Sequence, residues 1–134
     1  MPEQNFRDRV RESFAKQRVM QLIGTRLTLV EPGVIEIELP YREDLTQQDG
    51  FIHAGIVTTV LDSACGYAAY SLMPEGSSVL SVEFKVNLLA PAKAEVIKVR
   101  AEVKRAGRTL TVCTADAFAG EKVCATMLAT MIRR

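Results

Sequence analysis

The sequence predicts an α+β domain in which a curved antiparallel sheet of five to six strands wraps one long central helix. The helix is predicted from residues 54–73, a run that is apolar or small on nearly every side. The strands are predicted from segments in which apolar and polar residues alternate, most of them after the helix and joined by short turns. A helix without a polar face needs cover on most sides, and we expect a second copy of the protein to supply part of it.

Each remaining element follows from a local pattern. Residues 5–22 place apolar side chains near helical spacing among charges, which predicts an amphipathic N-terminal helix. Residues 26–39 alternate around a Glu-Pro-Gly turn, which predicts two short strands or a hairpin. The Pro-Glu-Gly sequence that begins at Pro74 ends the central helix. The short connections beyond it favour a hairpin meander with antiparallel pairing of strands over 79–89, 95–105, 109–119 and 123–132.

Length and composition exclude several classes of protein. At 134 residues, we expect a single domain over residues 1–134. Lys and Arg number 17 against 16 Asp and Glu, so the charge balance predicts no nucleic-acid partner. The sequence has neither a signal-peptide pattern nor an apolar run of roughly 18 residues, so we expect a cytoplasmic protein without a membrane partner. The three cysteines form neither a CxxC pair nor an even disulfide set, which favours buried, reduced thiols.

One acid, Asp62, interrupts the apolar helix in the segment QQDGFIHAGIVTTVLDSACGYAAY. An unpartnered buried carboxylate is costly, so the position calls for an explanation. Asp62 is either a general base or nucleophile, or a structural acid that faces water or is held by the hydroxyl of Thr58 or Thr59. The only histidine, His53, stands at the helix start, where we favour a hydrogen bond to the backbone over catalytic proton transfer.

The start of the helix offers a second chemical group. The N–H groups of Ala54 and Gly55 lie at the positive end of the helix dipole, where a polarised carbonyl or an oxyanion is stabilised. Asp62 lies eight residues further on, about 12 Å along the helix axis. One chain therefore cannot easily direct both groups at the same carbon atom. If both are catalytic, the simplest arrangement is a site shared across a two-fold interface.

Residues around the helix start and in the strands recur in a known family. The pattern consists of Gln47, Gly50, His53-Ala54-Gly55, Asp62, VEFKVNLLAPA at 82–92 and RAGRTL at 105–110. With this pattern the chain, from Gln47 to its end, resembles the hot-dog-fold acyl-CoA thioesterases, and within them the phenylacetate-degradation type. The resemblance implies a hot-dog fold, a homodimer formed by paired sheets, and dimers that associate into a homotetramer.

The resemblance also implies a role for each residue. Asp62 of one subunit attacks the thioester or activates water, while the Ala54 N–H of the other subunit polarises the carbonyl. The amide of Gln47 positions the thioester or the water, and the hydroxyl of Ser81 orients the water. Ala54 stands where the family often has Gly, which tightens the pocket but still supplies an N–H. Gly66 stands where some relatives have Thr, which places more weight on Ser81.

These residues predict an acyl-CoA thioesterase that hydrolyses an acyl or aryl-acyl thioester to the free acid and coenzyme A, without a metal or cofactor. Asp62 acts as a general base or forms a transient anhydride. Coenzyme A carries phosphates, so Lys93 and Arg108, at turns beside the motifs, are candidate substrate-binding residues together with Gly55. Two alternatives stay open: a hydratase or dehydratase of acyl thioesters that uses a catalytic histidine, and an acyl-CoA-binding module without chemistry.

Overall fold

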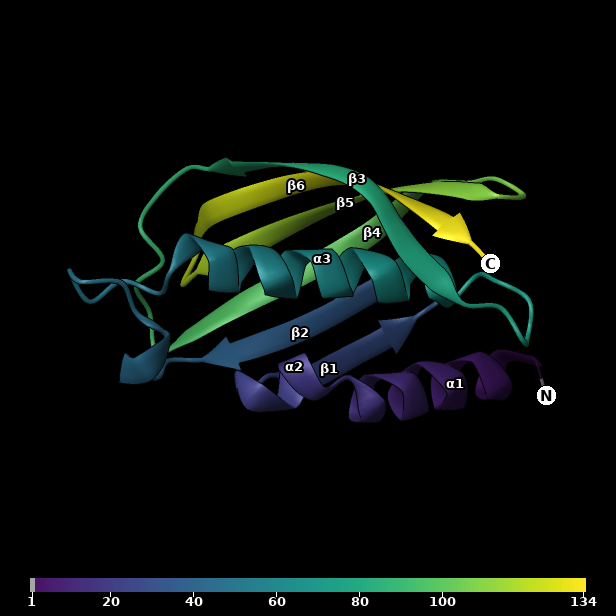
Figure 1. Cartoon of the computed structure of the whole chain (residues 1–134), viewed down its shortest axis with the longest axis horizontal. Coiled ribbons are helices and arrows are strands. Elements are labelled where there is room, and N and C mark those ends of the chain that lie inside the picture. Colours follow the sequence, from purple (N-terminus) through teal and green to yellow (C-terminus); the bar gives the residue numbers. More distant parts are fainter. Residues whose placement is uncertain (1) are drawn as a thin grey trace.

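One six-stranded antiparallel sheet curves around a long helix, as predicted (Figure 1). The structure is a computed structural model that describes residues 2–134, with side chains from residue 5. The helix is α3 (Ala54–Tyr70), and a short 3-10 helix, η1 (Glu43–Leu45), precedes it. The strand order is β1-β2-β4-β5-β6-β3. The strands are β1 (Arg26–Glu31), β2 (Val34–Pro40), β3 (Val79–Leu88), β4 (Val96–Ala106), β5 (Leu110–Ala119) and β6 (Lys122–Arg133).

The alternating pattern of the strands sorts their side chains between the core and the outer face. In β2, Ile35, Ile37 and Leu39 are completely buried beneath α3. Their neighbour Glu36 points to the opposite face, where it pairs with Arg100 of β4. Each fully buried aliphatic side chain contributes about 1.5–3 kcal/mol to folding, so this face of the sheet holds the helix in place.

Helix α3 ends three residues earlier than the sequence predicts, at Tyr70 rather than Met73. The N–H groups of Leu72 and Met73 bond to the carbonyls of Ala69 and Tyr70, three residues back. Pro74 explains this tighter last turn, because a proline disfavours the α conformation of the residue before it.

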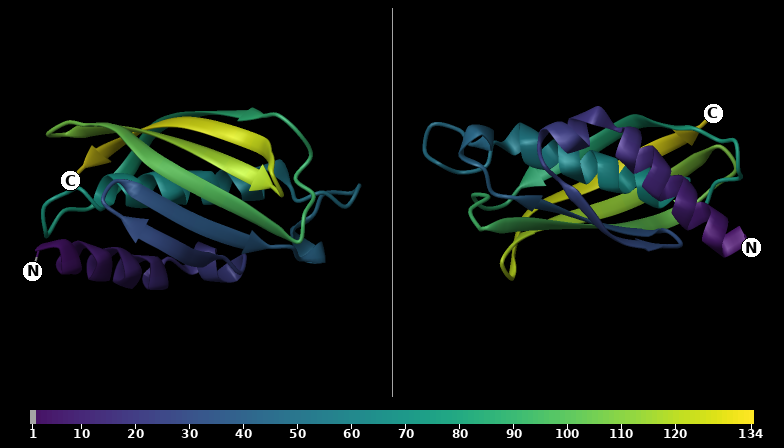
Figure 2. Two further views of the ribbon diagram at one scale, coloured as in Figure 1. Left: turned by 180° about the vertical axis from the view of Figure 1, so that it is seen from behind. Right: turned by 90° about the horizontal axis from the view of Figure 1, so that it is seen from below.

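The N-terminal region forms two helices instead of the single helix predicted over residues 5–22. Helix α1 (Pro2–Lys16) and helix α2 (Arg18–Leu22) are separated by Gln17, whose backbone is extended. The Gln17 side chain turns toward α3 and accepts a hydrogen bond of 2.9 Å from the Ser63 hydroxyl. Helix α1 packs along β1, and its Ser13 lies 3.2 Å from the Tyr67 hydroxyl of α3 (Figures 1 and 2). The break therefore joins the N-terminal helices to the central helix.

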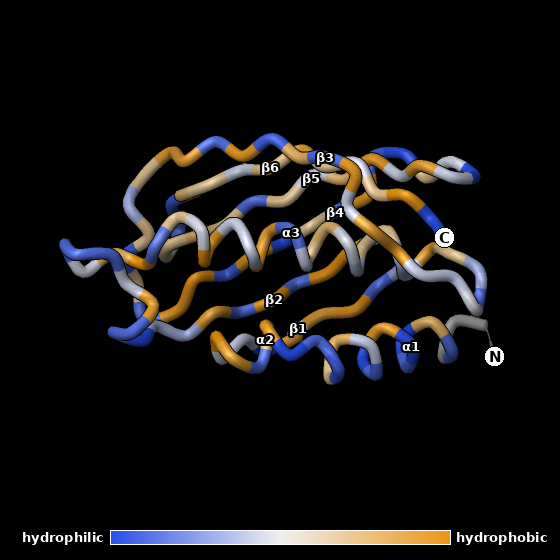
Figure 3. Tube along the Cα trace, in the orientation of Figure 1, coloured by the Kyte–Doolittle hydropathy of each residue, from blue (hydrophilic) through white to orange (hydrophobic). Residues whose placement is uncertain are grey.

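Strand β3 is an edge strand that pairs with β6, whereas the predicted meander places it next to the strand at 95–105. The connection 89–95 carries the chain across the sheet, and β4 pairs with β2 and β5 instead. Apolar and polar residues alternate along β3 (Figure 3). Although it lies at the edge, β3 exposes four large apolar side chains by 42–56%: Leu80, Val82, Phe84 and Leu88. An apolar edge strand of this kind is a surface for pairing with another chain.

Candidate active site

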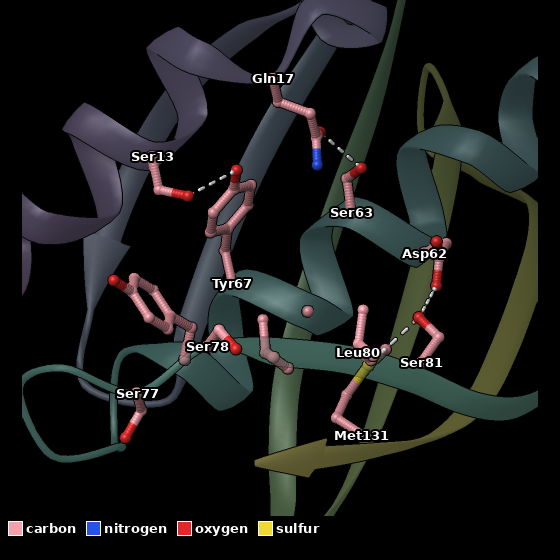
Figure 4. A pocket seen from close by; sticks show the side chains of 13 residues that line it. Ser13, Gln17, Asp62, Ser63, Tyr67, Ser77, Ser78, Leu80, Ser81 and Met131 are labelled. Atoms are coloured by element: carbon pink, nitrogen blue, oxygen red, sulfur yellow. Dashed lines mark hydrogen bonds between the residues drawn. The ribbon is translucent and has the colours of Figure 1, made fainter. Parts of the chain in front are cut away.

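The Asp62 carboxylate lies half-buried on α3 and faces strand β3 (Figure 4). The hydroxyl of Ser81 donates a hydrogen bond of 2.6 Å to Asp62 Oδ1. A shift in the β3–β6 register falls between Ser81 and Glu83, and bulges of this kind re-aim side chains near functional sites. The structure therefore brings together Asp62 and Ser81, two residues that the sequence selects and that lie nineteen positions apart in the chain.

Neither threonine that was considered as a structural partner holds Asp62. The hydroxyl of Thr58 donates to the carbonyl of Ala54 at 2.8 Å, and that of Thr59 donates to the carbonyl of Gly55 at 2.9 Å. Both bonds run back along the helix, as is common for Thr in helices. Among the described residues, the carboxylate is bound by one hydroxyl, that of Ser81 on β3, and its second oxygen meets no hydrogen-bond donor.

A pocket of about 360 Å³ opens beside Asp62 between α1, α3 and β3 (Figure 4). We call it the Asp62 pocket. Its walls are tied together by hydrogen bonds, since Ser13 of α1 lies 3.2 Å from the Tyr67 hydroxyl and Gln17 bonds to Ser63. Sequence reasoning missed these wall residues, because the approach of Ser13 and Gln17 depends on where α1 packs. The one local signal was Ser63, a polar residue in an apolar helix.

His53 is the N-terminal cap of α3, as favoured from the sequence. Its ring Nδ1 accepts a hydrogen bond of 2.8 Å from the Gly55 N–H, and the side chain is exposed. A Cβ at position 55 would lie 3.1 Å from this ring, so glycine gives the imidazole room to reach the backbone. The expectation that Gly55 offers a free N–H is wrong, because the cap occupies it.

The Ala54 N–H remains at the helix start. Among residues 2–134 it meets no hydrogen-bond acceptor. It lies on a second pocket of about 390 Å³, the Ala54 pocket, which is also lined by Gln47, Phe51 and Leu88. The side-chain oxygen of Gln47, Oε1, accepts hydrogen bonds from the N–H groups of Asp49 and Phe51 at 2.7 and 3.1 Å. These bonds fix the Gln47 amide so that its NH₂ group is the part left to donate.

The two pockets lie at opposite ends of the same helix and the same strand. The Asp62 pocket is lined by Val79, Leu80 and Ser81 at the start of β3, and the Ala54 pocket by Leu88 at its end. None of the described residues lines both pockets. Within one chain, the acid and the free helix-start N–H are thus separated, in agreement with the length of helix between them.

The two candidate basic residues lie in different places. Lys93 stands beside the Ala54 pocket, with its ammonium 5.8 Å from the centre of the Phe51 ring. Arg108 lies at the turn between β4 and β5 and lines a smaller pocket with Thr111 and Arg133, away from both Asp62 and Ala54. Of the two basic residues, Lys93 is thus the one that lies near a pocket with a candidate catalytic group.

The three cysteines are buried and unpaired, which confirms the predicted buried thiols. Burial raises the pKa of Cys65 well above its usual range, and the neighbouring Cys113 and Asp62 raise it further. Burial also raises the pKa of Cys113 to about 12. Both thiols therefore stay protonated and unreactive at neutral pH. Within residues 2–134, no helix combines the length and the apolar character needed to cross a membrane.

The family of the protein follows from comparison with known sequences. The model of the thioesterase superfamily matches residues 49–126, which include the helix start, Asp62 and Ser81 and span more than half of the chain. The chain belongs to the thioesterase superfamily. This confirms the predicted family and the predicted class of enzyme, a thioester hydrolase.

Individual relatives support this membership. The crystal structure of a thioesterase family protein from Silicibacter pomeroyi aligns with a TM-score of 0.94 and 55% sequence identity. The alignment covers 96% of this chain and 97% of that protein. Human acyl-coenzyme A thioesterase 13 is 28% identical over 108 residues, 78% of this chain and 76% of that protein. The PaaI protein of the E. coli phenylacetic acid degradation operon shares the hot-dog fold, with a TM-score of 0.91 at 15% identity. The alignment covers 100% of this chain and 96% of that protein.

Proposed function

We propose that the protein is an acyl-CoA thioesterase whose active site combines Asp62 and Ser81 of one subunit with Ala54 and Gln47 of another. One observation carries this proposal: the chain has two separate pockets, one with the Ala54 N–H, which meets no acceptor among the described residues, and the other with the Asp62 carboxylate, which is bound by the Ser81 hydroxyl. Acyl transfer needs both groups: the Ala54 pocket supplies a hydrogen-bond donor for the carbonyl oxygen, and the Asp62 pocket supplies a base.

Strand β3 supplies the geometry for joining the two halves. It is an edge strand with exposed apolar residues, so it can pair with β3 of a second copy. In an antiparallel pair, the start of one strand lies beside the end of the other. Because Ser81 is near the start of β3 and Leu88 is at its end, this pairing sets the Asp62 pocket of one copy beside the Ala54 pocket of the other.

The helix-start half polarises the thioester. The carbonyl oxygen of the thioester accepts a hydrogen bond from the Ala54 N–H at the positive end of the α3 dipole, where developing negative charge is stabilised. The NH₂ group of Gln47, on the same pocket, positions the thioester or the attacking water. His53 keeps the helix start in shape through its bond to Gly55 and takes no part in proton transfer.

The acid half supplies the attack. The Ser81 hydroxyl donates its hydrogen bond to Asp62 Oδ1, so the lone pairs of its oxygen can accept a hydrogen bond from water. As a general base, Asp62 Oδ2 takes a proton from water while the water oxygen attacks the carbonyl carbon; the C–S bond then breaks, and the coenzyme A thiolate that leaves takes up that proton. As a nucleophile, Oδ2 attacks the carbonyl carbon and displaces the coenzyme A thiolate to form an anhydride, which water hydrolyses to the free acid and the Asp62 carboxylate. Labelled solvent oxygen in Asp62 after a single turnover supports the anhydride, and its absence supports the general base.

We further propose a homodimer that associates into a tetramer in the cytoplasm, where reducing conditions suit three buried thiols. Light scattering of the purified protein measures the assembly. A monomer at micromolar concentration contradicts the shared site directly, because half of the catalytic groups are then missing.

The decisive experiment is a thioesterase assay over short, long and aromatic acyl-CoAs, with detection of the released thiol. The protein's own Cys65 and Cys113 should contribute little background, since burial raises the pKa of both thiols. We expect turnover with at least one acyl group. Binding of acyl-CoA by the wild type without any turnover would favour the binding module, and hydration of an enoyl thioester abolished by His53→Ala would favour the hydratase.

A further inference from the structure

The central helix contains a glycine that its packing does not require. Gly66 lies inside α3, one turn beyond Asp62, where glycine destabilises a helix relative to alanine. Its φ angle is negative. Apart from the adjoining residues and the nearby backbone of its own helix, a Cβ built at this position meets no heavy atom of the described residues within 4 Å, in contrast to Gly55, where the Cβ would lie 3.1 Å from the His53 ring. The fold of one chain therefore accepts a side chain at position 66.

The space above Gly66 is part of the Asp62 pocket. The residues of α3 that line this pocket are Asp62, Ser63, Gly66, Tyr67 and Tyr70, so it runs from the acid toward the C-terminal end of the helix. Gly66 lies about 6 Å beyond Asp62 along the axis, which is the reach of roughly four or five bonds from a carbonyl carbon held at the acid.

The chemistry of the walls indicates which arm of the substrate enters. None of the described residues that line the Asp62 pocket is Lys or Arg, so the pocket has no partner for the phosphates of the coenzyme. Its volume of about 360 Å³ is also too small for the whole coenzyme, whose nucleotide has to lie outside. The rings of Tyr67 and Tyr70, 6.4 Å apart and edge to face, form an aromatic wall beyond Gly66.

We propose that Gly66 sets the width of the acyl group: the missing side chain leaves room beside Asp62 for a ring or a branch. This inference rests on the proposed thioesterase function. It adds a specificity-determining position to that function, with wide acyl groups, aromatic ones above all, as the substrate class that the position admits. A methyl group at position 66 fills the space where the ring lies but leaves the reacting carbon untouched.

The test compares Gly66→Ala and Gly66→Val with the wild type on three substrates. Phenylacetyl-CoA and octanoyl-CoA have acyl groups of equal carbon number but different width, and propionyl-CoA is too short to reach position 66. We expect Gly66→Ala to lower kcat/KM for phenylacetyl-CoA by about tenfold or more, with a smaller loss for octanoyl-CoA and less than about a twofold change for propionyl-CoA. Gly66→Val should lower the phenylacetyl-CoA value further.

Stability provides an independent readout. Gly66→Ala should raise Tm by about 3 °C, because alanine favours the helix, while it impairs the wide substrate. Equal losses on all three substrates, no loss on any, or dissociation of the dimer would overturn the role of Gly66. The same holds for a wild type that turns over propionyl-CoA but not phenylacetyl-CoA. A wild type without activity on any acyl-CoA contradicts the thioesterase function itself, which separates the two failures.

Discussion

The two halves of the proposed site are built in different ways. The Ala54 half is local: a backbone N–H at a helix start that the adjacent His53 caps through Gly55, beside the turn around Gln47. The Asp62 half is assembled over long range, from an acid on α3 and a hydroxyl on β3. A backbone group survives most substitutions, whereas a side-chain pair does not. Activity should therefore be far more sensitive to mutation of a side chain that acts on the substrate, such as Asp62, than to mutation of His53 or Ala54 at the helix start.

The largest expected effect is at Asp62. Asp62→Asn preserves the shape of the side chain and its bond from Ser81 but removes the base and the nucleophile. We expect kcat to fall by about 100-fold or more, with acyl-CoA binding within a few-fold of the wild type. Thiol release measures kcat, and calorimetric titration of the variant with acyl-CoA measures binding.

Asp8→Asn, which removes an exposed acid of α1, is the matched control and should leave kcat unchanged. If Asp62→Asn retains more than about a third of the wild-type kcat, the acid is structural, and the chemistry has to be sought elsewhere.

A mixed dimer tests whether the halves come from different chains. In a dimer of one Asp62→Asn chain and one Gln47→Ala chain, a shared site puts both defects in one active site and leaves the other intact. We expect the purified heterodimer to recover about half of the wild-type activity, well above either mutant homodimer. Differently tagged, co-expressed chains allow this measurement. Activity equal to the mean of the two mutants would instead place each site within one chain.

The same contrast between local and long-range structure explains what could be predicted from the sequence. The alternation over residues 26–39 predicted two strands, and the position of His53 before an apolar helix predicted a backbone bond. Both depend on neighbours in the chain. The pairing of β3 with β6 depends on which strand reaches the edge of the sheet, and alternation within β3 carries no information about that.

The site follows the same division. Asp62 was conspicuous because a carboxylate in an apolar helix is rare, and Ser81 was selected through the resemblance alone. Their bond of 2.6 Å lies beside a shift in the β3–β6 register, which no local pattern indicates. The break at Gln17 was missed because it is stabilised by Ser63, a partner 46 residues away. A backbone bond of His53 was predicted, but its partner, the Gly55 N–H, was not, because that choice depends on the rotamer of one side chain.

Ser81 gives the next largest effect. Ser81→Ala removes a charge-assisted hydrogen bond to Asp62, worth about 1.5–3 kcal/mol, and the acceptor for the attacking water. We expect kcat to fall by roughly tenfold, measured by thiol release at saturating substrate.

Ser78→Ala is the matched control, since Ser78 lines the same pocket but its hydroxyl does not bond to Asp62. Equal losses in the two variants would indicate a general effect of pocket polarity rather than orientation of the water by Ser81.

The smallest expected effect is at His53, and two variants separate its structural role from a catalytic one. His53→Ala removes the acceptor for the Gly55 N–H and should lower the free energy of unfolding by about 1 kcal/mol. His53→Asn also lacks an imidazole but keeps a capping oxygen, so its stability should stay close to that of the wild type. Both should keep kcat/KM within about threefold, because the Ala54 N–H belongs to the backbone. Chemical denaturation and the thiol assay measure the two quantities. A comparable loss of activity of about 100-fold in both variants would make the imidazole itself catalytic, and the helix start would then depend on a side chain as the Asp62 half does.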